Sequence, residues 1–442
     1  MNIKLSDHFN YRRLLRFTLP SIVMMIFTSV YSIVDGLFVS NIVGKTSFSA
    51  LNFVMPAIMI IGAVGFMFGV GGSAIVAKTL GEGKHEKACR LFSMLVVTVA
   101  ILGVVLGAAG IVLVRPLCEL LGAEGAMLEE GVLYARILFA AIPFYMLQFE
   151  FQSFFIAAEK PQTGLLVTVV SGLSNMLLDW LLMAVFRWGI AGAAIATGMS
   201  QIIGVAISVV FFAGSGSGML RFARPILDWR ALGKACTNGS SEFVSNISMS
   251  VVGMLYNIRL MEYAGEDGVA AYGVLMYITM IFFAVFIGYA NGVAPVVSFH
   301  YGARNDAELK NLLRRSLVLI GIFSVLMFAA GEILARPLSE IFVGYDAELT
   351  AMSVHAFKIY SISFLLSGTA VLGSAFFTAL NDGLTSALIS FLRTMVFQVA
   401  AVLIFPLLWG LDGIWFSVAA AEVPAVLLVV IFLIVKRKKY NY

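Results

Sequence analysis

The stretch LPSIVMMIFTSVYSIVDGLFVS, residues 19–40, is apolar enough to cross a bilayer, and it carries the carboxyl group of Asp35 well inside it. About 20 apolar residues are what an α-helix needs to span the hydrocarbon core. An aspartate near the centre of such a helix costs about 2.5–3.5 kcal/mol on insertion scales, so it is read as functional by default. The alternative is an aspartate that only joins two helices by hydrogen bonds.

The composition of the whole chain agrees with this stretch. Of its 442 residues, 60% are hydrophobic and 12% are charged, and the mean hydropathy is +0.97. A soluble domain carries about 25% charged residues. Because lipid offers backbone groups no partner, the spans must be helices. No polar segment is long enough for a soluble catalytic domain, so we expect neither an enzyme nor a cofactor, and the net charge of +4 indicates no nucleic-acid partner.

Hydropathy predicts twelve spans joined by short loops. A glycine-rich stretch within the second, GAVGFMFGVGG, places Gly65 and Gly69 four residues apart and predicts close packing against another helix. The longest connection, 214–236, is rich in Gly and Arg and lies in the middle of the chain. The expected spans are 14–40, 51–78, 91–114, 132–158, 163–187, 189–213, 237–263, 269–299, 312–335, 351–380, 384–409 and 412–435.

Basic residues gather in alternate loops and at both ends of the chain, whereas the remaining loops are nearly free of them. Short cytoplasmic loops accumulate Lys and Arg. We therefore expect both termini in the cytoplasm, which an even number of spans requires. The basic side includes Arg12, Arg13, Arg16, Lys84, Lys87, Arg221, Arg224, Arg314, Arg315, Lys436 and Arg437.

An internal repeat organises the chain. The tripeptide RPL at 115–117 recurs at 336–338, and Trp188-Gly189 recurs as Trp409-Gly410 at the same spacing. Six spans per half make the repeat parallel, with a pseudo-twofold axis along the membrane normal. The expected fold is an all-α polytopic membrane protein of twelve transmembrane helices in two six-helix lobes. The expected division is an N-lobe (1–213), a cytoplasmic linker (214–236) and a C-lobe (237–442).

Polar residues of three N-lobe helices are predicted to share one depth. At 1.5 Å per residue, Asp35 lies about 8 Å from the outer end of its span and Asp179 about 12 Å from that of its own. Asn175 lies one turn deeper than Asp179 on the same helix face. Thr197 is also about 12 Å from the outside, and Tyr31 lies one turn below Asp35. Asparagine and threonine also join helices without any role in transport.

Other buried acids are secondary candidates. Glu150 lies about 27 Å from the outside, so it faces the cytoplasmic side of a cleft or pairs with a neighbouring glutamine. Glu242 is expected near the inner mouth of its helix, and Glu422 in the middle of the last span. In the repeat, Asp35 falls on Asn257, so the two lobes differ in charge. Arg393 is expected near the cytoplasmic end of its span.

These residues resemble the multidrug and toxic compound extrusion (MATE) family, and most closely its DinF-like and MepA-like bacterial branch. The resemblance covers essentially the whole chain. It rests on the first span with Pro20, Tyr31 and Asp35, on Asn175 and Asp179, on the repeated RPL segments, and on the basic loop KTLGEGKHEKA. It implies that Pro20 marks a bend of the first helix, and that Asp35, Asn175, Asp179 and Thr197 form a cation site in the N-lobe. It further implies a multi-pass protein of the bacterial inner membrane.

The expected function is a cation-coupled antiporter, driven most simply by H⁺, that exports organic cations by alternating access. Two carboxylates in a partly desolvated pocket do not both ionise easily, so the pair would take up a proton. Na⁺ bound to the same oxygens is the competing coupling ion. A flippase for lipid-linked oligosaccharides is the runner-up, and a channel or receptor is a third class. A monomer in the lipid bilayer is expected to suffice.

Overall fold

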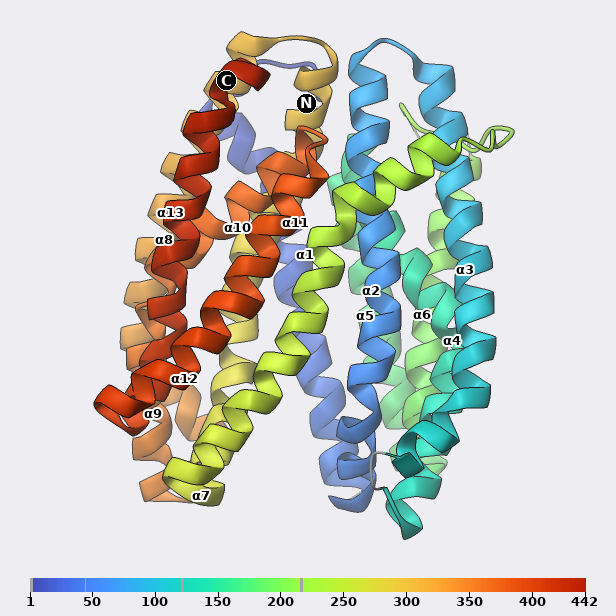
Figure 1. Cartoon of the computed structure of the whole chain (residues 1–442). Helices are drawn as coiled ribbons and strands as arrows, with labels where there is room; N and C mark the ends of the chain where they lie inside the picture. The colour runs from blue at the N-terminus through green and yellow to red at the C-terminus, as the bar shows by residue number, and fades with distance from the viewer. Residues whose placement is uncertain (1–2, 44, 121–122, 215–217) are drawn as a thin grey trace.

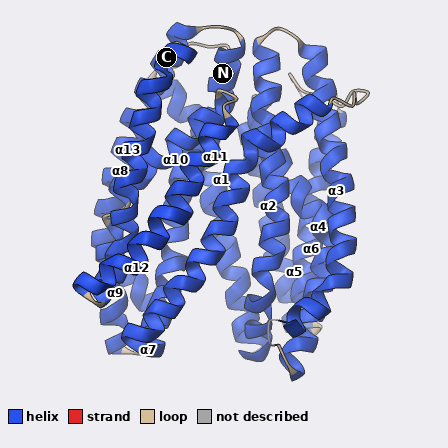
Figure 2. Ribbon diagram, in the orientation of Figure 1, coloured by secondary structure: helices blue, strands red, loops and turns tan. Residues whose placement is uncertain are grey.

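The structure is a computed structural model that describes residues 3–43, 45–120, 123–214 and 218–442. Its elements are helices, and no strand occurs in these ranges (Figure 2). They stand side by side in two bundles (Figure 1). The N-lobe contains α1 (Tyr11–Phe38), η1 (Val39–Val43), α2 (Lys45–Gly81), α3 (His85–Leu120), α4 (Gly125–Ala157), α5 (Pro161–Asp179), η2 (Trp180–Val185) and α6 (Gly189–Ala213). The C-lobe contains α7 (Trp229–Gly302), α8 (Asp306–Val343), α9 (Ala347–Ser361), α10 (Phe364–Ala379), α11 (Gly383–Phe391), η3 (Leu392–Phe397), α12 (Gln398–Trp409) and α13 (Leu411–Tyr440).

The number of membrane spans agrees with the sequence. In the described chain ten helices are long and apolar enough to cross a membrane, and the bent pair α9–α10 makes an eleventh. Helix α7 counts once among these ten, although its 74 residues are long enough for two spans. Its backbone leaves the helical region at Gly265 (φ 63°, ψ −150°). Its two arms are the two spans predicted at 237–263 and 269–299. The prediction of twelve helices in two lobes is confirmed.

One predicted span is interrupted. The stretch 351–380 was expected as a single helix, but α9 and α10 meet at an angle of 51°. Around the break, the N–H groups of Ser363 and Leu366 donate to carbonyl oxygens three residues back rather than four, those of Tyr360 and Ser363. Such tight turns change the direction of a helix axis. No proline marks the break, so the helix pattern gave no warning of it.

The segment that precedes the main helices of each lobe is buried in the hydrophobic core of the other lobe. Leu5, Phe9 and Phe17, at the start of the N-lobe, are buried in the core of the C-lobe. Leu220 and Leu232, which lead into the C-lobe, are buried in the core of the N-lobe. The first segment of each lobe therefore ties that lobe to the other.

The two lobes approach most closely on the face that carries both termini, at the top of Figure 1. A Cβ atom on Gly81 would lie 2.0 Å from the carbonyl oxygen of Phe299, and one on Gly302 would lie 2.0 Å from that of Lys78. Gly81 and Gly302 are repeat equivalents. The crossing of α2 and α7 therefore contains two matching contacts, which the pseudo-twofold axis relates to each other. Only glycine permits this approach of two backbones.

The predicted glycine contact within the N-lobe is also present. A Cβ atom on Gly65 would lie 2.4 Å from the Cα atom of Met146, and one on Gly69 would lie 3.0 Å from the Cα atom of Glu150. Helix α2 thus lies directly against α4, as the GxxxG spacing predicted.

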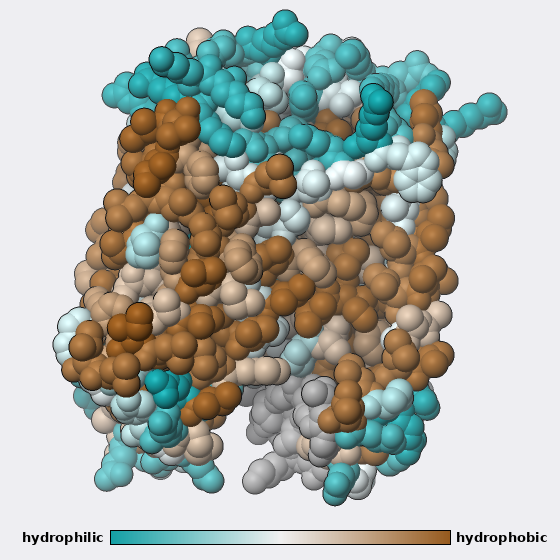
Figure 3. All heavy atoms as spheres, viewed as in Figure 1, coloured by the Kyte–Doolittle hydropathy of each residue, from teal (hydrophilic) through white to brown (hydrophobic). Residues whose placement is uncertain are grey.

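The surface of the molecule matches a protein embedded in lipid. Figure 3 shows a broad apolar band around both bundles, with polar residues at the face of the termini and at the opposite face. The molecule is hollowed between the bundles at the face opposite the termini. The lobes are therefore closed together at one face and apart at the other.

Candidate functional site

The two aspartates predicted as a pair meet inside the N-lobe. Asp179 is the last residue of α5 and is fully buried. Asp35, near the end of α1, is close enough for their two carboxyl groups to share a hydrogen bond. The π-helical turn η2 begins directly after Asp179. Such turns inside helices occur frequently at functional sites.

Most carboxyl oxygens of this pair have no donor among the described residues. Both carboxyl oxygens of Asp179 and Oδ1 of Asp35 have no hydrogen-bond partner among the N–H and O–H groups of the described residues. Two ionised carboxylates are acceptors only, so they can share a hydrogen bond only when one of them holds a proton. The arrangement therefore calls for a bound proton or another cation between the two groups.

Tyrosines surround the pair. Tyr31 of α1, which is half-buried, and Tyr134 of α4, which is fully buried, lie close enough to Asp35 to interact with it electrostatically, and Tyr134 also interacts with Asp179. The hydroxyl of Tyr134 has no partner among the described residues. Sequence reasoning missed Tyr134, although depth counting places it about 13 Å from the outer end of α4, level with Asp179.

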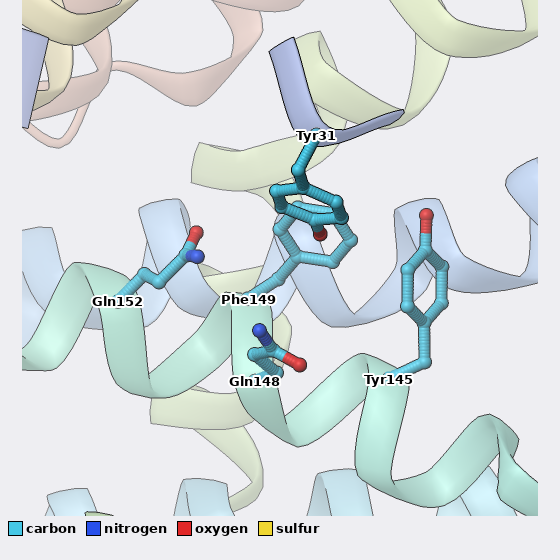
Figure 4. A pocket seen from close by; sticks show the side chains of 5 residues that line it. All are labelled: Tyr31, Tyr145, Gln148, Phe149 and Gln152. Carbon is cyan, nitrogen blue, oxygen red and sulfur yellow. The ribbon is translucent and has the colours of Figure 1, made fainter. Parts of the chain in front are cut away.

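A small cavity adjoins the site (Figure 4). Tyr31 points from α1 toward Tyr145, Gln148, Phe149 and Gln152, all of α4. The cavity has a volume of about 10 Å³, which is room for about one water molecule. Because Tyr31 is one turn closer than Asp35 to the start of α1, the cavity lies on the side of Asp35 toward the face of the termini.

The other predicted members of the site differ from one another in their hydrogen bonding and position. Asn175 is buried one turn below Asp179 on the same face of α5, and neither atom of its amide has a partner among the described residues. Thr197 of α6 donates its hydroxyl to the carbonyl of Ala193 in its own helix, at 3.0 Å. Pro20 lies within α1, which is a single helix from Tyr11 to Phe38.

Glu150 is buried alone. Its side chain is fully shielded from solvent, and neither carboxyl oxygen has a hydrogen-bond partner in the described part of the chain. The expected pairing with a neighbouring glutamine is therefore wrong. Gln148 and Gln152 instead donate to hydroxyl groups of α5. Because Glu150 lies two residues from each glutamine, it points to a different side of α4.

The C-lobe holds charges of both signs. Arg393 donates from Nε and Nη2 to the carboxylate of Glu422, at 2.7–3.0 Å, and Glu422 is 1% exposed. Arg393 lies ten residues into the span Gly383–Trp409, about 15 Å from its start. Glu242 of α7 interacts electrostatically with the same guanidinium, and Asn257, the counterpart of Asp35, is exposed.

Metal ligands do not gather elsewhere. The described residues contain no group of three or more His, Cys, Asp or Glu side chains able to hold a metal ion. A Na⁺ ion at the pair would therefore have to use neutral oxygens as well. The carbonyl oxygen of Asn175 is the nearest such group on the same face of α5.

Comparison with known proteins supports the fold and the repeat. The sequence model of the MatE family matches the chain twice, at residues 20–181 and 243–404. The chain therefore belongs to the MATE family of membrane transporters.

Individual relatives are distant but extend over nearly the whole chain. The multidrug export protein MepA of Staphylococcus saprophyticus is 24% identical over 93% of this chain and 91% of its own length. The MepA protein of Staphylococcus aureus strain MSSA476 is 23% identical over the same shares. A structure described as the outward-facing conformation of a multidrug resistance MATE family transporter superposes with a TM-score of 0.93 at 22% identity, covering 98% of this chain and 97% of that one. A MATE structure in complex with MaL6 gives 0.92 at 21% identity, with the same coverage.

Proposed function

We propose that this chain is a multidrug antiporter that exports organic, mostly cationic compounds by alternating access in exchange for a cation, most simply H⁺. The observation that carries the proposal is the pair Asp35 and Asp179, in which three of the four carboxyl oxygens have no N–H or O–H partner among the described residues. Such a pair must bind a proton or a cation to be stable in a medium of low dielectric. The names of the MepA relatives support the substrate class.

The proposed cycle couples charge at this pair to the position of the lobes. With the face of the termini closed, a proton from outside binds between Asp35 and Asp179 and displaces a cationic substrate. After the lobes rock, the proton leaves to the inside and the negative pair attracts the next cation. The substrate and the proton compete for the same negative charge, so they move in opposite directions.

The topology belongs to the same proposal. We place the face of the termini in the cytoplasm of a bacterial cell, because its loops carry the Lys and Arg residues. The structure then has the outward-open form, since its hollow lies at the opposite face. The proposed functional unit is a monomer in the lipid bilayer, divided into an N-lobe (1–213), a linker (214–236) and a C-lobe (237–442).

One observation favours Na⁺ as a second candidate for the coupling ion. Both amide atoms of Asn175 lack a partner among the described residues, one turn from Asp179, and a hard cation takes several oxygen ligands. The lipid-linked oligosaccharide flippase is less well supported. Such a substrate calls for free positive charge in the cleft, and Arg393 is neutralised by Glu422.

The test is transport of a cationic dye by purified protein in liposomes, under a pH gradient alone and under a Na⁺ gradient alone. We expect the pH gradient to drive the dye. We expect Asp35→Asn to abolish transport while the protein remains folded, because the neutral amide cannot carry the exchangeable charge. Asp412→Asn, which alters an exposed carboxylate paired with His355, is the matched control and should transport normally. Normal transport by Asp35→Asn would overturn the proposal.

A further inference from the structure

A buried polar stripe runs along α5 from the carboxyl pair toward the face of the termini. Thr168, Ser171, Asn175 and Asp179 follow one another at intervals of three and four residues, and none is more than 3% exposed. That spacing keeps the four side chains on one face of the helix. At 1.5 Å per residue, the stripe is about 16 Å long.

Two glutamines of α4 face this stripe. Gln148 donates from Nε2 to the hydroxyl of Ser171, and Gln152 donates from Nε2 to the hydroxyl of Thr168, each at 3.2 Å. Ser171 in turn donates to the carbonyl of Ser200 in α6, at 2.7 Å. The stripe is therefore a column enclosed by three helices.

Several polar atoms of the column have no hydrogen-bond partner among the described residues. The side-chain carbonyl oxygens of Gln148 and Gln152 have no partner among the described residues, and neither do the two amide atoms of Asn175. A buried polar group without a hydrogen bond costs about 1–3 kcal/mol. Ordered water is the usual partner of such groups in protein interiors. The cavity of about 10 Å³ between Tyr31 and the same two glutamines gives a water access to them.

The column ends before it reaches the face of the termini. Thr168 lies about 10 Å from the start of α5, and beyond it the ring of Phe155 packs against Gly164. Asp179 belongs to the stripe itself, Tyr31 and Tyr145 line the cavity beside the two glutamines, and Asp35 and Tyr134 interact electrostatically with these groups. Glu150 points to a different side of α4. The carboxyl pair is thus the only acidic group in contact with the column among the described residues.

We propose that this column is a hydrated path for the coupling proton, with Gln148 and Gln152 as positioning residues that hold its water. A proton leaves the Asp35–Asp179 pair when its O–H bond breaks and a water molecule accepts it. That water passes a proton to the next, and the carboxylate left behind retains the negative charge that a cationic substrate then neutralises. Phe155 and Gly164 close the end of the column nearer the face of the termini. This closure prevents a proton from crossing to that face while the lobes are apart at the opposite face.

The inference rests on the proposed proton coupling. It predicts that proton binding and the rate of proton transfer depend on different residues. Binding of a proton at equilibrium depends on the carboxyl pair, whereas its rate of transfer depends on the column. Gln148→Leu and Thr168→Val should each slow dye transport driven by a pH gradient at least about tenfold. The dissociation constant of the dye and its dependence on pH should remain unchanged. The rate ratio between H₂O and D₂O should rise as proton transfer becomes limiting.

Two controls make the result decisive. Thr98→Val removes a hydroxyl that, like that of Thr168, bonds to the carbonyl four residues back, but it lies on α3. This variant should transport normally. Thr168→Ser keeps the hydroxyl and should restore most of the rate. Transport within about twofold of the unaltered protein in both Gln148→Leu and Thr168→Val, with an unchanged isotope ratio, would overturn the column. If dye binding keeps its pH dependence in Asp35→Asn, the proposed function itself fails.

Discussion

The two lobes share one architecture but treat buried charge in opposite ways. In the N-lobe, Asp35 faces Asp179, and no basic side chain of the described residues pairs with either of them. In the C-lobe, Arg393 and Glu422 form a two-pronged ion pair with three hydrogen bonds. A pair of opposite charges is complete by itself, whereas a pair of like charges needs a mobile partner. The repeat therefore preserves the packing of the helices, and our proposal confines the exchangeable charge to one lobe.

The first prediction removes one member of each pair. Glu422→Gln should lower the free energy of unfolding by about 3 kcal/mol, because it removes the carboxylate that bonds the largely shielded Arg393 and leaves only the electrostatic interaction with Glu242. Asp179→Asn should not lower it, because the neutral amide replaces a carboxyl group that needs a shared proton to be stable beside Asp35. Chemical or thermal unfolding in detergent measures both. The doubly apolar Arg393→Met/Glu422→Leu protein should recover most of the loss. Equal losses in Glu422→Gln and Asp179→Asn would refute the contrast between the lobes.

The second prediction concerns a feature that the lobes share. Gly302→Leu should destabilise the closed face of the termini by about 1–3 kcal/mol, since its side chain would collide with the backbone at Lys78. Gly321→Leu is the matched control, because a Cβ there meets no atom within 4 Å. Unfolding of the two variants side by side tests this. Indistinguishable stabilities would show that the glycine crossing is not tight.

The third prediction uses a carboxylate outside the spans that is fully paired. Burial alone would raise the pKa of Asp382, but hydrogen bonds from Lys436, Tyr440 and Thr385 bring that pKa below its usual range. A depressed pKa in the folded state adds stability above the ordinary pKa of about 4, and this stability is lost as the pH falls. Asp382→Asn should lose about 1.5 kcal/mol at pH 7.

Unfolding of both proteins at pH 7 and at about pH 4 provides the check. The difference between Asp382→Asn and the unaltered protein should be smaller at the lower pH, where the carboxylate of the latter begins to be protonated. A difference that grows on acidification would contradict the assigned direction of the pKa.

The smallest effect is expected at charges that both lobes place on the surface. Arg115 pairs with Glu119 and Arg336 with Glu340, at equivalent positions of the repeat. Exposed ion pairs of this kind add little to stability. The double variant Arg115→Gln/Arg336→Gln should unfold at the same temperature as the unaltered protein. A clear drop in the unfolding temperature would show that these exposed ion pairs contribute to stability, contrary to this prediction.

Much of the fold could be predicted from hydropathy and the repeat, because a bilayer allows only a few solutions for the backbone. Depth counting also brought Asp35 and Asp179 together correctly, since it needs only the direction and the rise of each helix. It does not give the rotation of a helix about its axis. For that reason the pairing of Arg393 with Glu422 and the isolation of Glu150 were not predicted.

Two other features depend on packing between segments far apart in sequence. The exchange of Leu5 and Phe9 into the core of the C-lobe follows from the closed face of the termini, and no local pattern reports it. The break between α9 and α10 arises from a change of hydrogen-bond register at Ser363, without a proline. Tyr134 is different, because the depth argument applied to α4 would have found it.

Proton release on binding of a cationic dye tests the central claim most directly. Purified protein in weakly buffered detergent solution should release about one proton per dye bound, because the dye displaces the proton shared by Asp35 and Asp179. Asp35→Asn should release none, whereas Arg393→Met/Glu422→Leu should release as much as the unaltered protein. Undiminished release by Asp35→Asn, or its loss in the C-lobe variant, would contradict the assignment of the exchangeable charge to the N-lobe.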